Sequence, residues 1–318
     1  MPSLLDTHGP KAAEPANLWW LMFWISAAVF VLVLVLLAIA VLRQIRPRAT
    51  DARGLVYLSR LDGLTANALV IGVGLLLPAA VMVLLLIVDL RSLSVLASPA
   101  TPPRLTIQIK GHQFWWEVRY AEAQVTTANE IHVPVGEPVL LQITAEDVIH
   151  SVWIPQLMGK LDAIPFQTNT TWLQADQAGD YLGECAEFCG MQHAHMRFQV
   201  VAESAEQFDA WLQQQQQPAA QPTDSAGASG AQAFSRAGCI SCHTIRYGDQ
   251  AIGGILGPDL THVGGRRSLA AGTLDNSLGS MEGWISNPQA IKPGNTMPAV
   301  ALDADSLRAL ATYLESLK

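Results

Sequence analysis

The sequence predicts a multi-domain membrane protein: two transmembrane helices, then an all-β sandwich, then a small all-α domain. Two long uncharged runs lie within residues 15–88, short strand-like segments fill residues 104–201, and a helical pattern follows residue 233. The 318 residues suit about two domains at roughly 100–200 residues each. Half of the residues are hydrophobic and only 14% are charged, which excludes an intrinsically disordered chain.

The two uncharged runs have the length of membrane-spanning helices. Pro15–Leu42 holds 28 residues without a charge, roughly 42 Å of helix at about 1.5 Å per residue, enough to cross a hydrocarbon core of about 30 Å. Gly63–Val88 holds 26 and contains Pro78, which spanning helices tolerate because neighbouring groups satisfy the freed carbonyl. A pair of buried core helices is the weaker interpretation.

The loop between these runs sets the expected orientation. It is rich in arginine, whereas the N-terminal tail offers only Lys11; the loop arginines are Arg43, Arg46, Arg48, Arg53 and Arg60. The positive-inside rule therefore predicts a cytoplasmic loop with both termini outside. Residues 1–17 lack the layout of a signal peptide and are treated as a tail.

The chain divides into four expected regions. After a tail and hairpin at residues 1–98, residues 99–212 contain short β-branched and aromatic segments between turn signals, as in a β-sandwich. The expected strands are 105–109, 114–120, 139–144, 170–173 and 198–201, followed by a short helix near 205–213. Residues 213–232 are rich in Gln, Pro, Ala, Ser and Gly, which predicts a flexible linker. Residues 233–318 are helical, with an amphipathic last helix at 305–317.

Charge is distributed unevenly between the outer regions. Residues 101–217 contain 14 acidic and 5 basic residues, whereas residues 231–318 contain 7 of each. An acidic sandwich would attract a basic partner and speed their encounter, although ordinary solubilising charge explains the balance equally well. The pattern does not indicate a nucleic-acid surface.

The first group of metal-binding residue types spans twelve positions. It reads Cys185-Ala-Glu-Phe-Cys189-Gly-Met-Gln-His193-Ala-His-Met196. Thiolate, imidazole and thioether together favour copper. One blue-copper site needs a single cysteine, so two cysteines suggest two bridged copper ions, each with a terminal histidine, and His150 is our choice for the second. Zinc or a Cys185–Cys189 disulfide are the alternatives, and His195 is the less suitable ligand.

The second group is Cys239-Ile-Ser-Cys242-His243. C-x-x-C-H is the attachment motif for c-type haem, in which the cysteines form thioether bonds and the histidine is the proximal ligand. Met297 is the expected sixth ligand, ahead of Met281 and His262. The segment Gly-Pro258-Asp-Leu resembles the part of cytochrome c whose proline carbonyl accepts the Nδ1 proton of the proximal histidine. A redox-active thiol pair is the alternative.

The first group resembles the binuclear CuA motif of cytochrome c oxidase subunit II. Supporting stretches are Gly111-His-Gln-Phe-Trp-Trp116, Asp147-Val-Ile-His150-Ser-Val-Trp-Ile-Pro155 and Lys160-Leu-Asp162-Ala-Ile-Pro165. The resemblance covers about residues 18–202 and implies a cupredoxin-like Greek-key sandwich. It implies that Cys185 and Cys189 bridge the coppers, that His150 and His193 are terminal ligands, and that Met196 and the Glu187 carbonyl are weak ligands. It also implies that the Glu187 carboxylate reaches a magnesium ion shared with subunit I.

Subunit II with a fused cytochrome c is the pattern of caa-type haem-copper oxidases. The resemblance implies a bacterial plasma-membrane subunit that takes electrons from a soluble cytochrome c and passes them to haem in subunit I, with subunit III as a further partner. Oxygen reduction and proton pumping would occur in subunit I, so this chain would have no catalytic residue of its own.

Two departures from the family pattern concern the paths of electrons and protons. The family commonly has a tryptophan after Gly-His-Gln, whereas this chain has Phe114, so Trp115 or Trp116 becomes the candidate electron entry. A glutamate and a Trp-Thr pair linked to proton uptake are replaced by Asp62-Gly-Leu-Thr65, so no proton-path residue is assigned. A CuA subunit of a nitric or nitrous oxide reductase, and a copper carrier or electron shuttle, remain alternatives; a quinol oxidase is disfavoured because the copper ligands are complete.

Overall fold

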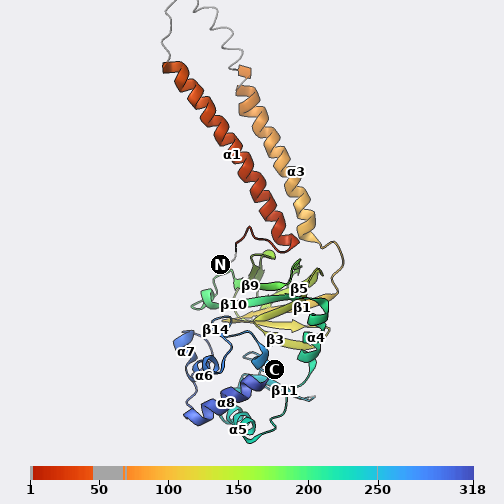
Figure 1. Ribbon diagram of the computed structural model, residues 1–318, viewed down its shortest axis with the longest axis vertical. Helices are drawn as coiled ribbons and strands as arrows, with labels where there is room; N and C mark the ends of the chain where they lie inside the picture. Colours follow the sequence, from red (N-terminus) through yellow and green to blue (C-terminus); the bar gives the residue numbers. More distant parts are fainter. Residues whose placement is uncertain (1–2, 46–66, 69, 249) are drawn as a thin grey trace, which may run out of the picture. The chain divides into compact units, whose positions relative to one another are not determined.

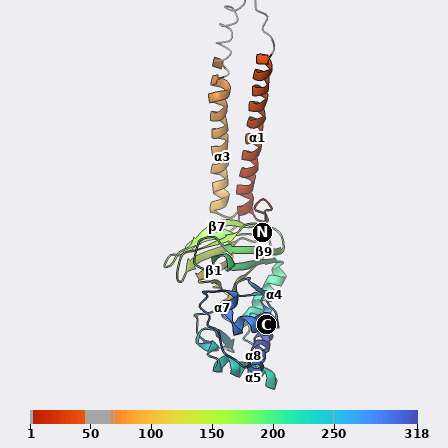
Figure 2. The ribbon, with the colours of Figure 1, turned by 90° about the vertical axis from the view of Figure 1, so that its left-hand side faces the viewer.

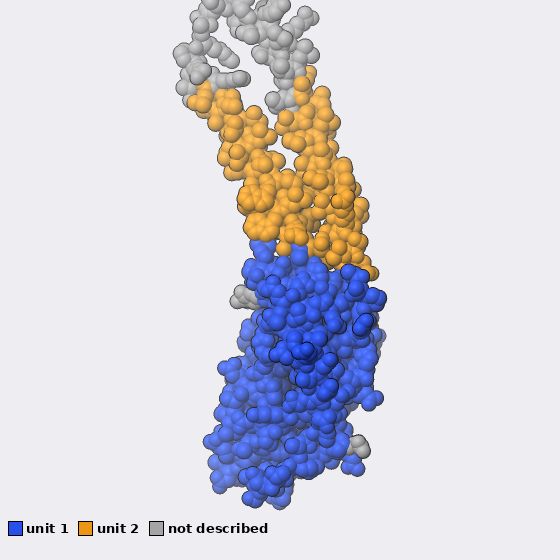
Figure 3. Space-filling view, turned by 45° about the vertical axis from the view of Figure 1, so that its right-hand side comes forward, with its two compact units in different colours: residues 1–13, 99–318 blue, residues 14–98 orange. Residues whose placement is uncertain are grey.

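The computed structural model describes residues 3–45, 67–68, 70–248 and 250–318. These residues form two compact units (Figure 3): residues 14–98, and residues 1–13 together with 99–318. The loop residues 46–66, which include four of the five arginines used for the orientation and the segment Asp62–Thr65, lie outside the described residues.

Two apolar helices form most of the first unit. Helix α1 spans Pro10–Ile45, and helix α3 spans Leu77–Ala97 after a π-helical turn at Gly72–Leu76; they run side by side (Figures 1 and 2). Both are long and apolar enough to cross a membrane, and no residue in their most hydrophobic windows is buried. Pro78 stands in the first turn of α3, directly after the π-helical turn, and this π turn adjusts the hydrogen-bond ladder around the proline.

The second unit begins with a β-sandwich of ten strands. Its strands are β1 (Leu105–His112), β2 (Trp115–Tyr120), β3 (Val125–Ala128), β4 (Glu130–Pro134), β5 (Val139–Ala145), β6 (His150–Ile154), β7 (Met158–Ala163), β8 (Asn169–Leu173), β9 (Gly179–Cys185) and β10 (Arg197–Glu203). One sheet has the order β3-β2-β1-β5-β8 and the other β4-β10-β9-β6-β7. The pairs β1–β5 and β4–β10 are parallel and the remaining pairs antiparallel, so the expected sandwich is confirmed.

The core of the sandwich lies between the two sheets. Strand β5 alternates buried and half-buried residues along its length, as a strand with one covered face should. The largest side chains in this core are Trp116, Tyr120 and Phe198. All five strands expected from the sequence form, and His150 is the first residue of strand β6, directly after the turn at residues 146–149.

The N-terminal residues belong to the same compact unit as the sandwich. The amide of His8 donates to the Gln156 carbonyl at 2.8 Å, and the His8 carbonyl accepts from the Asp176 amide at 2.8 Å. The expected tail is therefore attached to the sandwich by backbone hydrogen bonds.

A small, mainly helical domain follows the sandwich, as expected. Helix α4 (Ala205–Gln216) comes first, and the domain contains α5 (Ser225–Arg236), α6 (Leu278–Ser286), α7 (Pro288–Ile291) and α8 (Ala304–Ser316). Two short hairpins accompany the helices: β11 (Thr244–Tyr247) with β12 (Gln250–Gly253), and β13 (Ser268–Leu269) with β14 (Leu274–Asp275).

The small residues of the expected linker have a packing role. Helix α5 begins at Ser225, inside residues 213–232, and packs on α8. A Cβ atom at Gly230 would lie 2.3 Å from the Ala309 carbonyl oxygen, so glycine permits this close approach. Before α5, the Ala219 amide donates to the Arg246 carbonyl at 2.7 Å. The helical domain therefore includes part of the segment whose composition favours a linker.

Candidate metal centre and haem cavity

The donors of the first group meet around the loop that follows β9. Cys185 is the last residue of β9, and a 3-10 turn at His193–His195 returns the chain to β10. The Cys189 Sγ atom lies 3.8 Å from the Cys185 Sγ atom, 3.8 Å from the His193 Nδ1 atom and 3.8 Å from the Met196 Sδ atom. His150, Cys185 and Cys189 form a buried group with the spacing of metal ligands.

The two cysteines are separate thiols. Their sulfur atoms are 3.8 Å apart, whereas a disulfide bond is about 2.0 Å long, and both cysteines are free. The expected alternative of a disulfide is therefore absent from this structure. Each sulfur also has its own imidazole, because His150 Nδ1 lies 3.9 Å from Cys185 and His193 Nδ1 lies 3.8 Å from Cys189.

Asp147 orients His150 from the side opposite the cysteines. Its Oδ1 atom lies 2.9 Å from His150 Nε2, which leaves Nδ1 directed at Cys185. Burial lowers the pKa of His150, but hydrogen bonds to Asp147 and Cys185 outweigh it, so the pKa is raised overall. A Cβ atom at Gly111 would lie 2.7 Å from the His150 ring, so the glycine of β1 leaves room for this imidazole.

The cysteine pair shares a proton unevenly. The pKa of Cys185 is lowered, chiefly because of its hydrogen bond with Cys189, and the same hydrogen bond raises the pKa of Cys189. A bound cation would favour loss of both protons, since metals bind thiolates.

Glu187 and His195 have different places in the loop. The Glu187 carbonyl oxygen lies 3.3 Å from the Cys185 Sγ atom, while the Glu187 side chain is exposed. The His195 Nδ1 atom lies 2.9 Å from the Gln192 side-chain oxygen, so this ring bonds within the loop rather than to the sulfur atoms. Glu187 thus presents its carbonyl to the cluster and its carboxylate to the outside.

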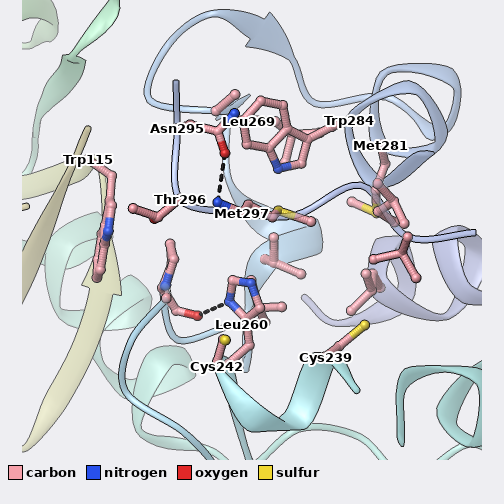
Figure 4. Close-up of a pocket in the computed structure, with 18 of the residues that line it drawn as sticks. Trp115, Cys239, Cys242, Leu260, Leu269, Met281, Trp284, Asn295, Thr296 and Met297 are labelled. Atoms are coloured by element: carbon pink, nitrogen blue, oxygen red, sulfur yellow. Dashed lines mark hydrogen bonds between the residues drawn. The ribbon is translucent and has the colours of Figure 1, made fainter. Parts of the chain in front are cut away.

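The second group lines an apolar cavity of about 490 Å³ in the helical domain. Cys239, Cys242, His243 and Met297 all contribute to its wall, and so does Met281. Figure 4 shows Met297 on the side of the cavity opposite Cys239 and Cys242. An apolar cavity bounded by two cysteines, an imidazole and a thioether suits a covalently attached haem.

His243 is held with one nitrogen free for a metal. Its Nδ1 atom lies 2.8 Å from the Pro258 carbonyl oxygen, the contact expected from the sequence. Burial lowers the pKa of His243, which favours the neutral ring. The neutral ring donates its Nδ1 proton to Pro258 and leaves the Nε2 lone pair available.

Met297 is fixed by its own segment. Its backbone amide donates to the Asn295 side-chain oxygen at 2.8 Å (Figure 4). Met281 also reaches the cavity and is only 2% exposed, so it remains a candidate ligand. His262 does not line the cavity, because its Nε2 atom bonds the Gln217 carbonyl at 3.0 Å.

The two candidate tryptophans face different sites. Trp115 lines the cavity (Figure 4) and stacks on the His112 ring, with centroids 4.2 Å apart. Trp116 is fully buried on the other face of β2, and its ring centroid lies 5.7 Å from that of His150. Phe114 also lines the cavity, so Phe114 and Trp115 lie beside the cavity and Trp116 lies beside the sulfur cluster.

Two further residues, Gln113 and Lys292, connect these sites. Gln113 belongs to the Gly111–Trp116 stretch, but that stretch does not indicate a contact with Cys189. Gln113 lines the cavity, and its Nε2 atom donates to the Cys189 carbonyl at 2.5 Å. Lys292 also lines the cavity, although it is only 2% exposed. Its partners are up to 178 positions away in the sequence, so no local pattern could indicate them.

Both outer domains match known protein families. Residues 122–204 match the family of the cytochrome c oxidase subunit II periplasmic domain, and residues 227–318 match the cytochrome c family. The chain is a subunit II protein with a fused cytochrome c domain. Together with its two apolar helices, this makes it a membrane-anchored protein with periplasmic domains.

Individual relatives agree with these matches. Cytochrome c oxidase subunit 2 of Alkalihalophilus pseudofirmus is 39% identical over 213 residues, which are 67% of this chain and 61% of the relative. The subunit of Bacillus subtilis is 32% identical over 223 residues, 67% of this chain and 62% of that protein. This subunit II chain thus spans about three fifths of these relatives. The solved periplasmic domain of subunit II from Bradyrhizobium japonicum is 30% identical over 36% of this chain and 94% of that one, with a TM-score of 0.35.

Proposed function

We propose that this chain is the electron-transfer subunit of a caa-type, proton-pumping terminal oxidase. Electrons would pass from cytochrome c through the chain's own haem and dicopper sites to haem in subunit I, where oxygen is reduced to water. The observation that carries the proposal is the pairing of each cysteine sulfur with a separate imidazole, in the same compact unit as the C-x-x-C-H cavity.

The copper site is assigned to the residues around the β9–β10 loop. Cys185 and Cys189 would bridge two ions, with His150 and His193 as terminal ligands and Met196 and the Glu187 carbonyl as weak ones. A bridged copper pair supplies one-electron transfer with the charge change spread over both ions. The chain's part is to hold six donors: His150 at the start of β6, and five at the end of β9 and in the loop that follows it. Anchoring on two paired strands limits movement of the ligands.

The haem site is assigned to the cavity of the helical domain. Cys239 and Cys242 would form the covalent attachments, with His243 and Met297 as axial ligands. The Pro258 carbonyl fixes the His243 ring, and His–Met ligation favours a high reduction potential. Trp115, at the cavity, and Trp116, beside His150, are the candidate electron-entry residues.

The partners and location follow from the family. Subunit I and subunit III would assemble with this chain in the bacterial plasma membrane, with both termini on the periplasmic side. The exposed Glu187 carboxylate would reach a magnesium ion shared with subunit I. This placement is supported by the outward direction of that side chain, while the carbonyl of the same residue lies 3.3 Å from the Cys185 sulfur.

Metal and optical analysis of the purified full chain tests the assignment. We expect two copper ions and one covalent haem per chain, with near-infrared and thiolate bands beside a c-type haem spectrum. The Cys189→Ser variant should lose the copper bands and keep the haem. A single zinc ion, or a copper spectrum that survives in Cys189→Ser, would contradict the proposal.

A further inference from the structure

Lys292 is a buried cation at the junction of the two outer domains. It is 2% exposed, and its Nζ atom donates to the carbonyl oxygens of Phe114 at 3.0 Å, His195 at 2.9 Å and Ala270 at 3.0 Å. An ammonium group has three protons to donate, and these three carbonyls accept them all. Burial lowers the pKa of Lys292 to about 8, so the group is a cation at neutral pH.

The three acceptors belong to both domains. Phe114 lies in the turn between β1 and β2, and His195 lies in the turn between His193 and Met196, two proposed copper ligands. Ala270 lies between strands β13 and β14 of the cytochrome c domain. Lys292 belongs to the same domain and directly follows helix α7. We call the segment at residues 185–196, which contains most of the proposed copper ligands, the copper loop. One side chain therefore holds the copper loop, the wall of the haem cavity and the cytochrome c domain together.

Other hydrogen bonds surround this contact. The Arg197 amide donates to the Ala271 carbonyl at 3.1 Å, and Gln192 Nε2 donates to the Pro293 carbonyl at 2.9 Å. The Arg267 amide donates to the Glu130 carboxylate at 2.5 Å. Arg267 also pairs with Asp180, but both side chains are nearly half exposed and such a pair contributes little. Two acidic residues of the sandwich, Glu130 and Asp180, thus meet Arg267 of the cytochrome c domain.

The same interface contains a short connection between the two sites. Gln113 lines the haem cavity and donates to the Cys189 carbonyl at 2.5 Å, so one hydrogen bond joins the cavity wall to the peptide of a proposed copper ligand. Gln113 and Cys189 both belong to the sandwich, so their hydrogen bond reaches the haem cavity only while the cytochrome c domain, which supplies most of the cavity wall, stays docked.

We propose that Lys292 is the positioning residue that locks the cytochrome c domain onto the copper loop. This docking keeps the haem cavity next to Gln113, whose side chain donates a hydrogen bond to the Cys189 carbonyl. The electron-transfer role of this docking rests on the proposed function. The docking itself can be measured without copper or haem. A fixed arrangement removes the search step that a mobile tethered domain would need before each transfer.

Amide hydrogen exchange of the full chain in detergent tests the docking. The amides of Arg197 and Arg267 report it, because each bonds across the interface. In Lys292→Met, which keeps the length and removes the three donors, we expect both to exchange at least about tenfold faster as the docked population falls. Amides of β5, in the sandwich core, should not change, and the exposed Lys160→Met is the matched control.

Two further readouts keep the test decisive. In the wild-type chain both interface amides should be protected; exchange at the rate of an open loop would overturn the docking even if Lys292→Met fails to fold.

In the protein loaded with copper and haem, light-triggered haem-to-copper electron transfer should be independent of viscosity in the wild type. In Lys292→Met it should become slower and depend on viscosity. Equal exchange in wild type and Lys292→Met would also overturn the proposal. Absence of copper or haem from the wild type would instead contradict the proposed function.

Discussion

The Nε2 atom of His150 lies 2.9 Å from the Asp147 Oδ1 atom, while its Nδ1 atom faces the Cys185 sulfur at 3.9 Å. The carboxylate therefore determines which nitrogen of the ring is available to a metal ion. Asp147 also accepts hydrogen bonds from the amides of Gln113 and Val148, each at 2.7 Å, so the carboxylate is itself fixed. His150 comes from outside the loop between β9 and β10, so its orientation depends on this carboxylate in the turn that precedes β6.

Replacing Asp147 should weaken copper binding without touching a ligand. In Asp147→Ala we expect about a 10–100-fold loss of copper affinity, the usual effect of removing the partner of a ligating histidine. Competition with a copper chelator measures it, and the haem spectrum should be unchanged. The neighbouring Glu146→Ala, which removes an exposed pair with Lys110, is the control. Equal affinities in the two variants would show that Asp147 does not orient His150.

The proposed ligands that the sequence could indicate are those within short spacing of one another. Cys185 to Met196 occupy a single loop, and Cys239 to His243 a single turn, so their residue types and spacing predict the chemistry. His150 could be chosen only as a histidine near the end of a strand, because 35 residues separate it from Cys185. Lys292 could not be chosen at all, because its acceptors at Phe114 and His195 are brought to it by the packing of two domains.

Composition was a weaker guide to the boundary between the domains. A run of small and polar residues predicts a linker when its hydrogen bonds and packing are unknown. In the structure Gly230 lies against the backbone of α8, and Arg246 donates to the carbonyls of Gln215 and Gln217 at 2.7 and 2.9 Å. These contacts depend on residues about 30 or more positions later in the chain, so the local composition does not show them.

Met297 and Met281 can be separated by substitution. In Met297→Ala we expect loss of the sixth haem ligand, seen as loss of the thioether-to-iron absorption band and a lower haem potential, since methionine ligation raises it. The copper bands should not change. Met281→Leu conserves volume in the cavity wall and should keep both spectra. The reverse pattern, with the band lost only in Met281→Leu, would assign the ligand to Met281.

Gly257 leaves the space in which the His243 ring lies. A Cβ atom there would lie 2.6 Å from the His243 Cε1 atom, so Gly257→Ala should displace the ring from Pro258 and destabilise the domain by about 1–3 kcal/mol, as overpacking does. Thermal unfolding and the yield of covalent haem measure the effect. Gly279→Ala, in helix α6 with nothing within 4 Å of the added atom, should instead be neutral or stabilising by up to about 1 kcal/mol. Similar losses in both variants would mean that the contact with His243 is not the cause.

His132 should make stability depend on pH. It is buried between two carboxylates, 2.8 Å from Glu203 and 3.7 Å from Glu130. Burial lowers its pKa, but the hydrogen bonds to Glu130 and Glu203 outweigh this and raise the pKa overall. A raised folded-state pKa stabilises the protein below the unfolded value of about 6.5, and this contribution disappears as the pH rises through the folded-state pKa.

The cost of His132→Gln should therefore be larger at acidic pH than at alkaline pH. Each unit by which the pKa is raised corresponds to about 1.4 kcal/mol of extra stability below both pKa values. The difference in unfolding free energy between wild type and His132→Gln, measured from pH 5.5 to pH 9, should shrink as the pH rises. In Glu203→Gln, which removes the closer carboxylate, the pH dependence of the same His132→Gln substitution should be smaller. A pH-independent cost in both backgrounds would show that the charge on His132 does not contribute, and that only its stacking on the Trp211 ring, 4.0 Å away between centroids, is lost.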